Sequence, residues 1–284
     1  MSTKTKKKRK KRASLRTWVF RILMGLCLVI FCYSGWKLFE IWQGNHQIEK
    51  ETETLKQYLQ QGTATPVPSN GENSAVEDQP QGTTSTESYF SVDWEGLKAA
   101  NPNVVAWLIV PGTGISYPVV QGADNDYYLN HSFNGQYNEL GAVFLDCTAN
   151  PDFLDDNSMI YGHSVDIGGM FTALKNFTNL NFFESHPYFW LLTPSQNYRC
   201  EIVAFYKGND DSAIYTVDFG DYEHEVMQQI YQEAMYTRDL NLDGKHFVTL
   251  STCNLDYGYS SNQRYVLMGV LQEWNELIPV SMTK

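Results

Sequence analysis

Three side chains in this chain have the types and the positions that nucleophilic acyl transfer requires. Cys253 ends the apolar run Thr249-Leu250-Ser251-Thr252-Cys253, His163 follows the apolar run 158–162, and Arg264 opens the last such run. A thiol at a strand end that faces a loop is placed to react. An imidazole beside it can act as base toward the thiol and as acid toward a leaving amine, and a guanidinium can hold an oxyanion. Each residue also has a structural explanation: a buried thiol, a structural histidine or a surface ion pair.

The other cysteines and histidines do not add a second site. Cys200 lies inside an apolar run and is expected to be a small buried side chain. Cys147 and Cys200 could form a disulfide, which the sequence does not decide. The remaining histidines are scattered without metal-binding spacing, so neither a metal nor a cofactor is expected. The order of His163 before Cys253 argues against a papain-like enzyme.

The N-terminal segment has the pattern of a membrane anchor. Residues 1–37 hold 11 of the 21 Lys and Arg residues and no Asp or Glu, and Arg21 is the one charge between Trp18 and Trp36. About 20 apolar residues suffice to span a bilayer, and basic flanks stay cytoplasmic. We therefore expect a cytoplasmic tail at 1–17, a single transmembrane anchor at 18–42 and the rest of the chain outside. A cleaved signal peptide is the alternative, but the apolar stretch is not followed by a small-x-small cleavage site.

The remainder of the chain is strongly acidic and contains one candidate domain. After residue 37 there are 10 Lys and Arg residues against 32 Asp and Glu, which argues against nucleic acid as a partner. Residues 46–62 have the composition of a polar helix. Residues 63–88 contain no aromatic residue and are rich in polar and turn-forming types, as in a flexible stalk. We therefore assign 43–88 to a helix and stalk and 89–284 to one domain.

The segments that must position the three reactive side chains are short and β-rich. A helix that begins near Asp93 precedes them, and helical patterns interrupt them at 168–177 and 222–236. The second helical pattern carries apolar residues at 226, 230 and 234, a stripe that is expected to pack on the strands. The mainly β pattern predicts a closed or sandwiched β fold. Its eight apolar runs are 104–110, 115–120, 141–146, 158–162, 188–193, 198–206, 246–252 and 264–271.

In combination these residues resemble the sortases, the cysteine transpeptidases of Gram-positive cell surfaces, and class B most closely. The run 249–253 with Arg264 matches the family's TLxTC…R motif, and Tyr161-Gly162-His163 matches its histidine strand. The resemblance covers roughly 90–273 in order. It extends to the segments 101–107, 111–113, 117–121, 126–129, 141–146 and 169–171.

The resemblance implies a fold and a set of roles. The fold is an eight-stranded sortase-type β-barrel with an N-terminal helix and an extra helix before the cysteine strand. Cys253 would be the nucleophile, His163 the general acid and base, and Arg264 the stabiliser of substrate or oxyanion. Ser251 and Thr252 would bind the substrate. The sequence departs from the family in a slightly long loop between Cys253 and Arg264 and in an acidic residue at Asp256 rather than nearer the cysteine.

The implied function is that of a membrane-anchored cysteine transpeptidase. It would cleave the C-terminal sorting motif of surface proteins through a thioester, and transfer them to an amine of peptidoglycan or its lipid-linked precursor. Two alternatives remain open on the sequence. One is a membrane-tethered cysteine peptidase without transfer, which amine-dependent product formation would distinguish. The other is a non-catalytic surface binding module in which Cys253 is merely buried, which thiol reactivity would distinguish.

Overall fold

The computed structural model describes residues 15–63, 88–165, 169–240, 242, 245–258 and 260–283. The chain divides into two compact units, Met1–Gln47 and Ile48–Lys284. In the first unit, the stretch Trp18–Glu40 is long and apolar enough to cross a membrane, and none of it is buried. It belongs to the helix α1 (Leu15–Leu55). Residues 1–14 of the predicted tail and 64–87 of the predicted stalk lie outside the described residues.

The segment predicted as a polar helix at 46–62 is helical only in its first part. Helix α1 ends at Leu55, and the 3-10 helix η1 (Lys56–Tyr58) and strand β1 (Leu59–Thr63) follow. Strand β1 pairs antiparallel with β2 (Ser88–Val92). The expectation of a helix to residue 62 was therefore wrong. A distant strand supplies hydrogen bonds to β1, and such tertiary pairing overrides a weak local propensity.

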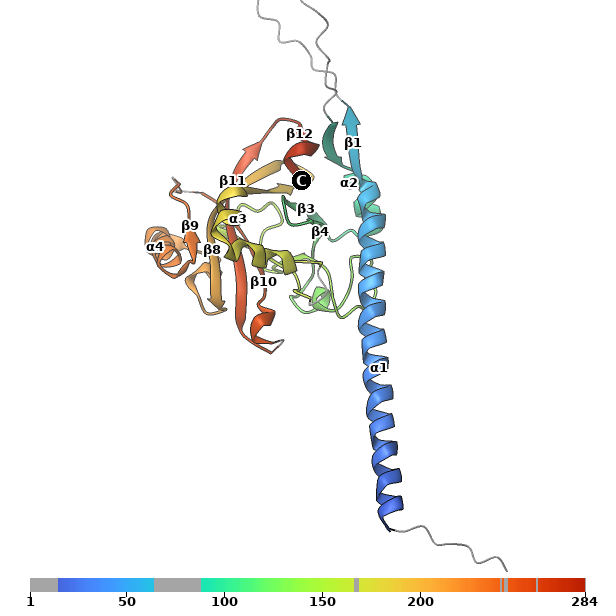
Figure 1. Cartoon of the computed structure of the whole chain (residues 1–284). Coiled ribbons are helices and arrows are strands. Elements are labelled where there is room, and N and C mark those ends of the chain that lie inside the picture. Colours follow the sequence, from blue (N-terminus) through green and yellow to red (C-terminus); the bar gives the residue numbers. More distant parts are fainter. Residues whose placement is uncertain are drawn as a thin grey trace, which may run out of the picture. The chain divides into compact units, whose positions relative to one another are not determined.

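The main sheet closes on itself as a barrel (Figure 1). Its strands follow one another in the order β11-β10-β6-β5-β4-β3-β7-β8, and β8 pairs back to β11 along most of its length. The predicted eight-stranded barrel is thus confirmed. The barrel strands are β3 (Val104–Val110), β4 (Ile115–Gln121), β5 (Phe144–Leu145), β6 (Asn157–Tyr161), β7 (Tyr188–Leu192), β8 (Asn197–Asn209), β10 (Phe247–Cys253) and β11 (Gln263–Trp274).

Besides β1 and β2, two short strands lie outside the barrel circuit. Strand β9 (Tyr236–Thr237) adds to the edge of β8, and β12 (Ile278–Pro279) pairs with β2 to complete a three-stranded sheet with β1. The 3-10 helices besides η1 are η2 (Tyr127–Leu129), η3 (Thr172–Thr178), η4 (Ala213–Tyr215), η5 (Gly220–Tyr222), η6 (Leu255–Tyr257) and η7 (Val280–Thr283).

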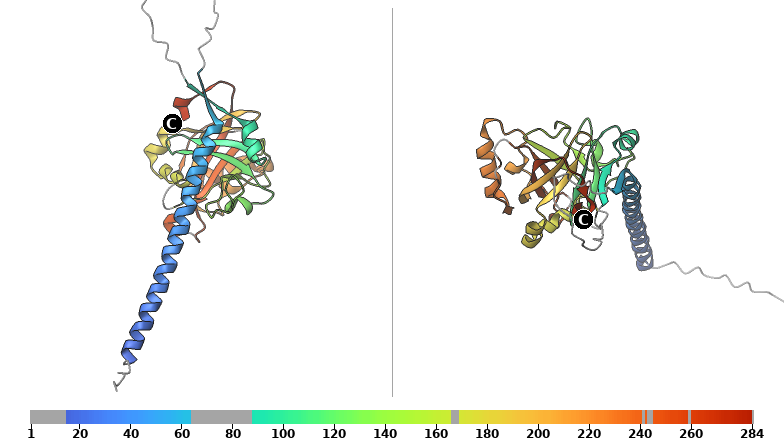
Figure 2. Two further views of the ribbon diagram at one scale, coloured as in Figure 1. Left: turned by 90° about the vertical axis from the view of Figure 1, so that its right-hand side faces the viewer. Right: turned by 90° about the horizontal axis from the view of Figure 1, so that it is seen from above.

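Alternation along β10 gives that strand two buried faces with different partners. Val248 and Leu250 belong to the large apolar cluster that includes Leu267 of β11 and fills the barrel. Phe247, on the other face, belongs to a second cluster with Met227 and Ile230 of helix α4 (Glu223–Glu233). Helix α4 confirms the helix predicted before the cysteine strand, and it lies at the outer edge of the barrel in Figure 1 and in the right-hand view of Figure 2.

The remaining helices flank the barrel. Helix α2 (Trp94–Ala100) begins where the sequence predicted, because the Asp93 carboxylate accepts a hydrogen bond from the Gly96 N–H at 3.0 Å. Within the helical pattern predicted at 168–177, the structure has the 3-10 helix η3, which begins only at Thr172. Helix α3 (Leu180–Ser185), which the sequence did not predict, follows it. Met170 has a φ of 46°, a left-handed conformation that is incompatible with a helix starting before it.

Candidate active site

Cys253 and Arg264 share one face of a hairpin. Cys253 is the last residue of β10, and the strand register places Arg264 of β11 directly opposite it. Directly opposed residues of antiparallel strands carry their side chains on the same face of the sheet. Cys253 is half-buried with a free thiol, and that thiol has no hydrogen-bond partner among the residues that the structure describes. The thiol is thus partly accessible on the face from which the guanidinium also projects.

His163 lies at the corresponding end of the neighbouring strand. Strand β6 runs parallel to β10 with Tyr161 opposite Ser251, and the Gly162 N–H continues the ladder by donating to the Ser251 carbonyl at 3.2 Å. His163 is two residues beyond Tyr161, just as Cys253 is two residues beyond Ser251. The strand ends that carry the imidazole and the thiol are therefore level with one another.

A backbone carbonyl orients the His163 ring. Its Nε2 lies 2.8 Å from the Leu129 carbonyl oxygen at the end of η2. A carbonyl oxygen only accepts hydrogen bonds, so Nε2 is assigned the proton in this contact. In the neutral ring this leaves Nδ1 as the nitrogen that can accept a proton from a thiol.

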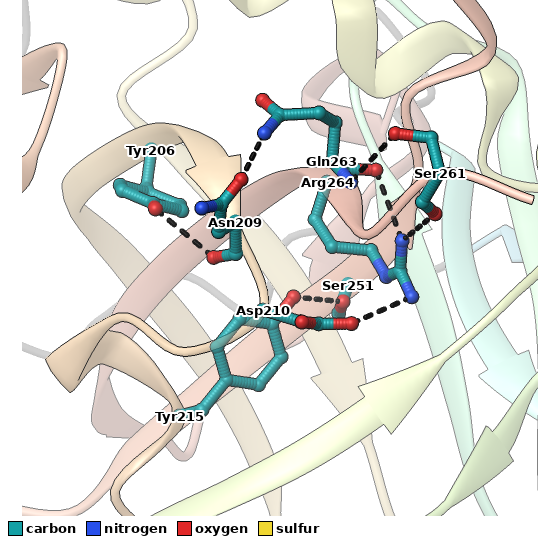
Figure 3. A network of polar contacts seen from close by, with 8 residues as sticks. All are labelled: Tyr206, Asn209, Asp210, Tyr215, Ser251, Ser261, Gln263 and Arg264. Atoms are coloured by element: carbon teal, nitrogen blue, oxygen red, sulfur yellow. Dashed lines mark hydrogen bonds and ion pairs between the residues drawn. The ribbon is translucent and has the colours of Figure 1, made fainter. Parts of the chain in front are cut away.

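The Arg264 guanidinium is held by the loop before it and by an acidic side chain (Figure 3). Its Nη1 donates to the carbonyls of Ser261 at 2.8 Å and Gln263 at 3.1 Å. Its Nη2 pairs with the Asp210 carboxylate at 2.8 Å. Arg264 therefore forms the ion pair that a structural role would require. It also lies directly opposite Cys253, as a catalytic role would require.

Ser251 lies on the same face as Cys253, because side chains two residues apart in a strand point the same way. Its hydroxyl is 2.7 Å from the Tyr215 hydroxyl, and the two point at each other in Figure 3. Burial raises the pKa of Tyr215, so its phenol remains a neutral hydrogen-bonding group. Tyr215 thereby covers part of the face beside Cys253.

Asn157 anchors the segment that carries Tyr215. Its side-chain amide donates to the carbonyls of Ile214 at 3.1 Å and Thr216 at 2.9 Å, and its oxygen accepts from the Thr249 hydroxyl at 2.7 Å. Tyr215 was not predicted from the sequence, because the stretch 207–221 has no strand or helix periodicity and Asn157, which anchors it, lies on a distant strand.

Two residues considered from the sequence lie elsewhere. The Thr252 side chain points to the opposite face of β10 from Cys253, and its hydroxyl is buried without a partner among the described residues. The Asp256 carboxylate accepts a hydrogen bond from the Tyr265 hydroxyl at 2.8 Å. Because Tyr265 neighbours Arg264 in β11, its side chain points to the face opposite Arg264. The structure thus brings Ser251, Cys253 and Arg264 onto one face, and Thr252 does not share it.

The disulfide that the sequence left open does not form. Cys147 is half-buried, Cys200 is fully buried inside the barrel, and both are free thiols. Burial raises the pKa of the Cys200 thiol well above its ordinary value, as the sequence interpretation of a small buried side chain implies. Cys200 is therefore an inert core residue.

The family and the relatives of this chain agree with its fold. The family model described as a sortase domain matches residues 108–272. Sortase B of Listeria monocytogenes serovar 1/2a (strain ATCC BAA-679 / EGD-e) is 31% identical over 265 residues, which cover 90% of this chain and 98% of the relative.

Solved structures give the same result. A class B sortase of Streptococcus pyogenes involved in pilus biogenesis is 35% identical with a TM-score of 0.58, over 64% of this chain and 98% of that one. A Staphylococcus aureus sortase B–substrate complex is 26% identical with a TM-score of 0.59, over 63% of this chain and 84% of that one. The chain therefore belongs to the sortase family, and within it to the class B sortases.

Proposed function

We propose that this chain is a membrane-anchored transpeptidase in which Cys253 is the nucleophile. One observation carries the proposal: Cys253 and Arg264 are register partners on one face, and His163 lies two residues past the end of the parallel strand β6 beside them. Sortases are cysteine transpeptidases, and the family match spans all three residues. The thiol, the imidazole and the guanidinium supply a nucleophile, a proton carrier and an oxyanion stabiliser.

The first half of the reaction forms a thioester. His163 takes the Cys253 thiol proton on Nδ1 as the sulfur attacks the carbonyl carbon of the threonine in a sorting motif. The tetrahedral oxyanion is stabilised by N–H groups of Arg264. The peptide C–N bond then breaks, and the protonated His163 gives its Nδ1 proton to the departing amine. The surface protein remains attached to sulfur by an acyl bond.

The second half transfers that acyl group to an amine. The amine attacks the thioester carbonyl, the C–S bond breaks, and His163 accepts a proton from the attacking nitrogen. His163 then returns this proton to the sulfur, and the products are a new amide and the regenerated thiol. Water in place of the amine would give hydrolysis, so transfer requires an acceptor site that disfavours water. No metal or cofactor enters this scheme.

The substrates and the location follow from the class. We propose a surface protein with an NPxTx-like or LPxTG-like C-terminal motif, bound along the face that carries Ser251 and Cys253, and an amine of peptidoglycan or its lipid-linked precursor as acceptor. Thr252, which the sequence also suggested for substrate binding, is buried on the opposite face of β10. The Staphylococcus aureus relative is described as a substrate complex, which supports a sorting peptide as ligand. We propose a cytoplasmic tail at 1–17, a transmembrane anchor at 18–42 and a catalytic domain outside the membrane at 89–284, joined to the anchor through 43–88. The apolar stretch Trp18–Glu40 supports the anchor, which would keep the enzyme close to both substrates.

The test is a peptide-library cleavage assay with mass detection of the covalent intermediate. The full chain in detergent should acquire the mass of the acyl fragment on Cys253, and addition of an amine acceptor should convert hydrolysed product into amide. Cys253→Ala should remove the adduct and the cleavage while leaving the melting temperature nearly unchanged. Hydrolysis that no amine diverts would instead indicate a peptidase. A Cys253 that neither acylates nor reacts with a small alkylating agent would indicate a binding module.

A further inference from the structure

We propose that Asp210 is a positioning residue for Arg264: its carboxylate fixes the guanidinium in the orientation that stabilises the oxyanion at Cys253. The inference rests on the proposed function and adds a residue that the sequence did not single out. Asp210 is the first residue after β8, and its Oδ2 lies 2.8 Å from the Arg264 Nη2.

Hydrogen bonds hold the backbone that carries Asp210, which keeps its exposed carboxylate within reach of Arg264. Asn209 pairs with Gln263 in the β8–β11 ladder, and the Asp210 N–H donates to the Asn262 carbonyl at 3.1 Å. The Tyr206 hydroxyl donates to the Asn209 carbonyl at 2.9 Å. Figure 3 shows the contact from Tyr206 to Asn209 and the ion pair of Asp210 with Arg264.

Gly208 permits this network. A Cβ on Gly208 would lie 2.2 Å from the Tyr206 hydroxyl oxygen, so a larger residue there would displace the phenol that holds the end of β8. Gly208 is also the register partner of Arg264. The end of β8, which Asp210 follows, thus pairs directly with Arg264, the residue that the Asp210 carboxylate contacts.

Counting the donors of Arg264 shows what the arrangement leaves available. A guanidinium has five N–H groups in a rigid plane. The two on Nη1 meet the carbonyls of Ser261 and Gln263, and one on Nη2 meets Asp210. Among the residues that the structure describes, the Nε–H and the second Nη2–H have no partner. The contacts therefore leave two N–H groups of the guanidinium able to donate to a substrate oxygen.

The ion pair of Asp210 and Arg264 lies near Tyr215, whose hydroxyl contacts Ser251. The pKa of Tyr215 is raised mainly by burial, and the charges of Arg264 and Asp210 act on it in opposite directions. Both charges therefore lie near the phenol that bonds Ser251. A substrate strand that runs over Ser251 toward Cys253 would pass the ion pair.

The neighbouring residue supplies a matched control. Asp211 is exposed, and its side chain makes no hydrogen bond or ion pair with any residue that the structure describes. Asp210→Ala and Asp211→Ala therefore remove the same charge from the same loop, but only the first removes the contact to Arg264. A difference between the two variants reports the contact and not the net charge.

The experiment measures acylation of the full chain in detergent by release of the leaving peptide at saturating sorting peptide. We expect Asp210→Ala to lower kcat about tenfold or more, since small displacements of an aligned group cost that much, while KM stays within about twofold. Asp211→Ala should match the wild type, and Asp210→Glu should recover part of kcat. Melting temperatures of all variants should agree within about two degrees, because partly exposed ion pairs stabilise little.

A second readout does not depend on turnover. In the wild type the Arg264 side-chain N–H signals should be resolved by NMR, and Asp210→Ala should broaden them while Asp211→Ala leaves them unchanged. Equal kcat in the two alanine variants, or a kcat raised by Asp210→Ala, would overturn the positioning role. If the wild type forms no thioester at all, the proposed function fails instead, and unchanged Arg264 signals in Asp210→Ala would still overturn the inference.

Discussion

At Arg264 the planar shape of the guanidinium matters as much as its positive charge. Its Nη1 reaches two carbonyls while Nη2 reaches a carboxylate, a pattern that requires a planar fork. Lysine has one nitrogen and cannot keep these contacts while it also donates to an oxyanion. We expect Arg264→Lys to lower the acylation rate about a hundredfold, the usual effect of losing an oxyanion donor. Peptide release at saturating substrate measures it, with Lys207→Arg as the control, and a rate within threefold of wild type, on the order of 0.6 kcal/mol, would contradict the role.

The pair of hydroxyls at Ser251 and Tyr215 gives a second prediction at this scale. Tyr215→Phe removes a 2.7 Å hydrogen bond between two partly buried groups and keeps the ring. We expect a loss of about 1 kcal/mol in the free energy of unfolding in urea, and a similar loss for Ser251→Ala. The double variant should lose clearly less than the sum of the two, because both changes remove the same bond. Strict additivity would show that the hydroxyls do not interact.

The residues predicted from sequence are those that stand at the ends of apolar runs. Cys253, His163 and Arg264 are visible because strand ends face loops, and the parallel and antiparallel registers then bring those ends level. Asp210 and Tyr215 were missed because they lie in an irregular stretch that Asn157 and Asn262 hold from other parts of the chain. The Leu129 carbonyl was also missed, since a backbone group carries no signal in a residue type. Their roles in catalysis remain predictions until tested.

At the scale of elements, the eight predicted runs correspond to the eight barrel strands, and β5 shows where the correspondence fails. The run 141–146 contributes only Phe144–Leu145. Gly141 has a φ of 58°, and a Cβ on it would lie 2.3 Å from the Tyr128 carbonyl oxygen. The Ala142 N–H donates to that carbonyl, so the start of the run packs against η2 instead of pairing as a strand. The apolar composition of the run 141–146 thus predicted correctly that these residues are buried, but it overestimated the length of the strand that they form.

Asp146, directly after β5, links this short strand to its neighbours. Burial acts to raise its pKa, but hydrogen bonds from the Thr148 N–H and hydroxyl, the Asn125 amide and the Tyr161 hydroxyl lower it overall. A carboxylate with a depressed pKa stabilises the fold above its unfolded pKa of about 3.9, and this stabilisation is lost as the pH falls through the folded pKa.

Asp146→Asn should therefore destabilise the protein in a pH-dependent way. Near neutral pH we expect a loss of about 1–3 kcal/mol, typical of hydrogen bonds to a charged acceptor. The difference from the wild type should shrink at a second, acid pH below about 3.9, because this stabilisation is lost as the pH falls through the depressed pKa of the wild-type carboxyl. Urea unfolding at both pH values measures it, with Asp152→Asn, an exposed position, as the control. A difference that is constant over this range would show that the charge of Asp146 is not what stabilises the fold.

At the scale of the whole molecule, the second compact unit begins at Ile48, well before the domain start expected at residue 89. Leu55 is 5% exposed and belongs to an apolar cluster with Leu97 and Val104, against which Tyr58 also packs. The Tyr58 carbonyl accepts a hydrogen bond from the Asp93 N–H at 2.8 Å, at the start of α2. The segment just after the predicted anchor is therefore part of the folded unit and not only a spacer.

This arrangement predicts how two truncations will differ. A chain of residues 48–284 should fold in solution, lose binding to lipid vesicles and cleave a sorting peptide at the rate of the full chain. A chain of residues 89–284 should melt about 5–10 °C lower. The lost burial of a leucine-sized side chain is worth about 1.5–3 kcal/mol, and each kcal/mol shifts the melting temperature of a domain this size by about 2–4 °C. Leu55→Ala in the longer chain should reproduce much of that shift. Equal melting temperatures for the two truncations would mean that residues 48–63 contribute nothing to the barrel domain, and the boundary expected from sequence would then be the correct one.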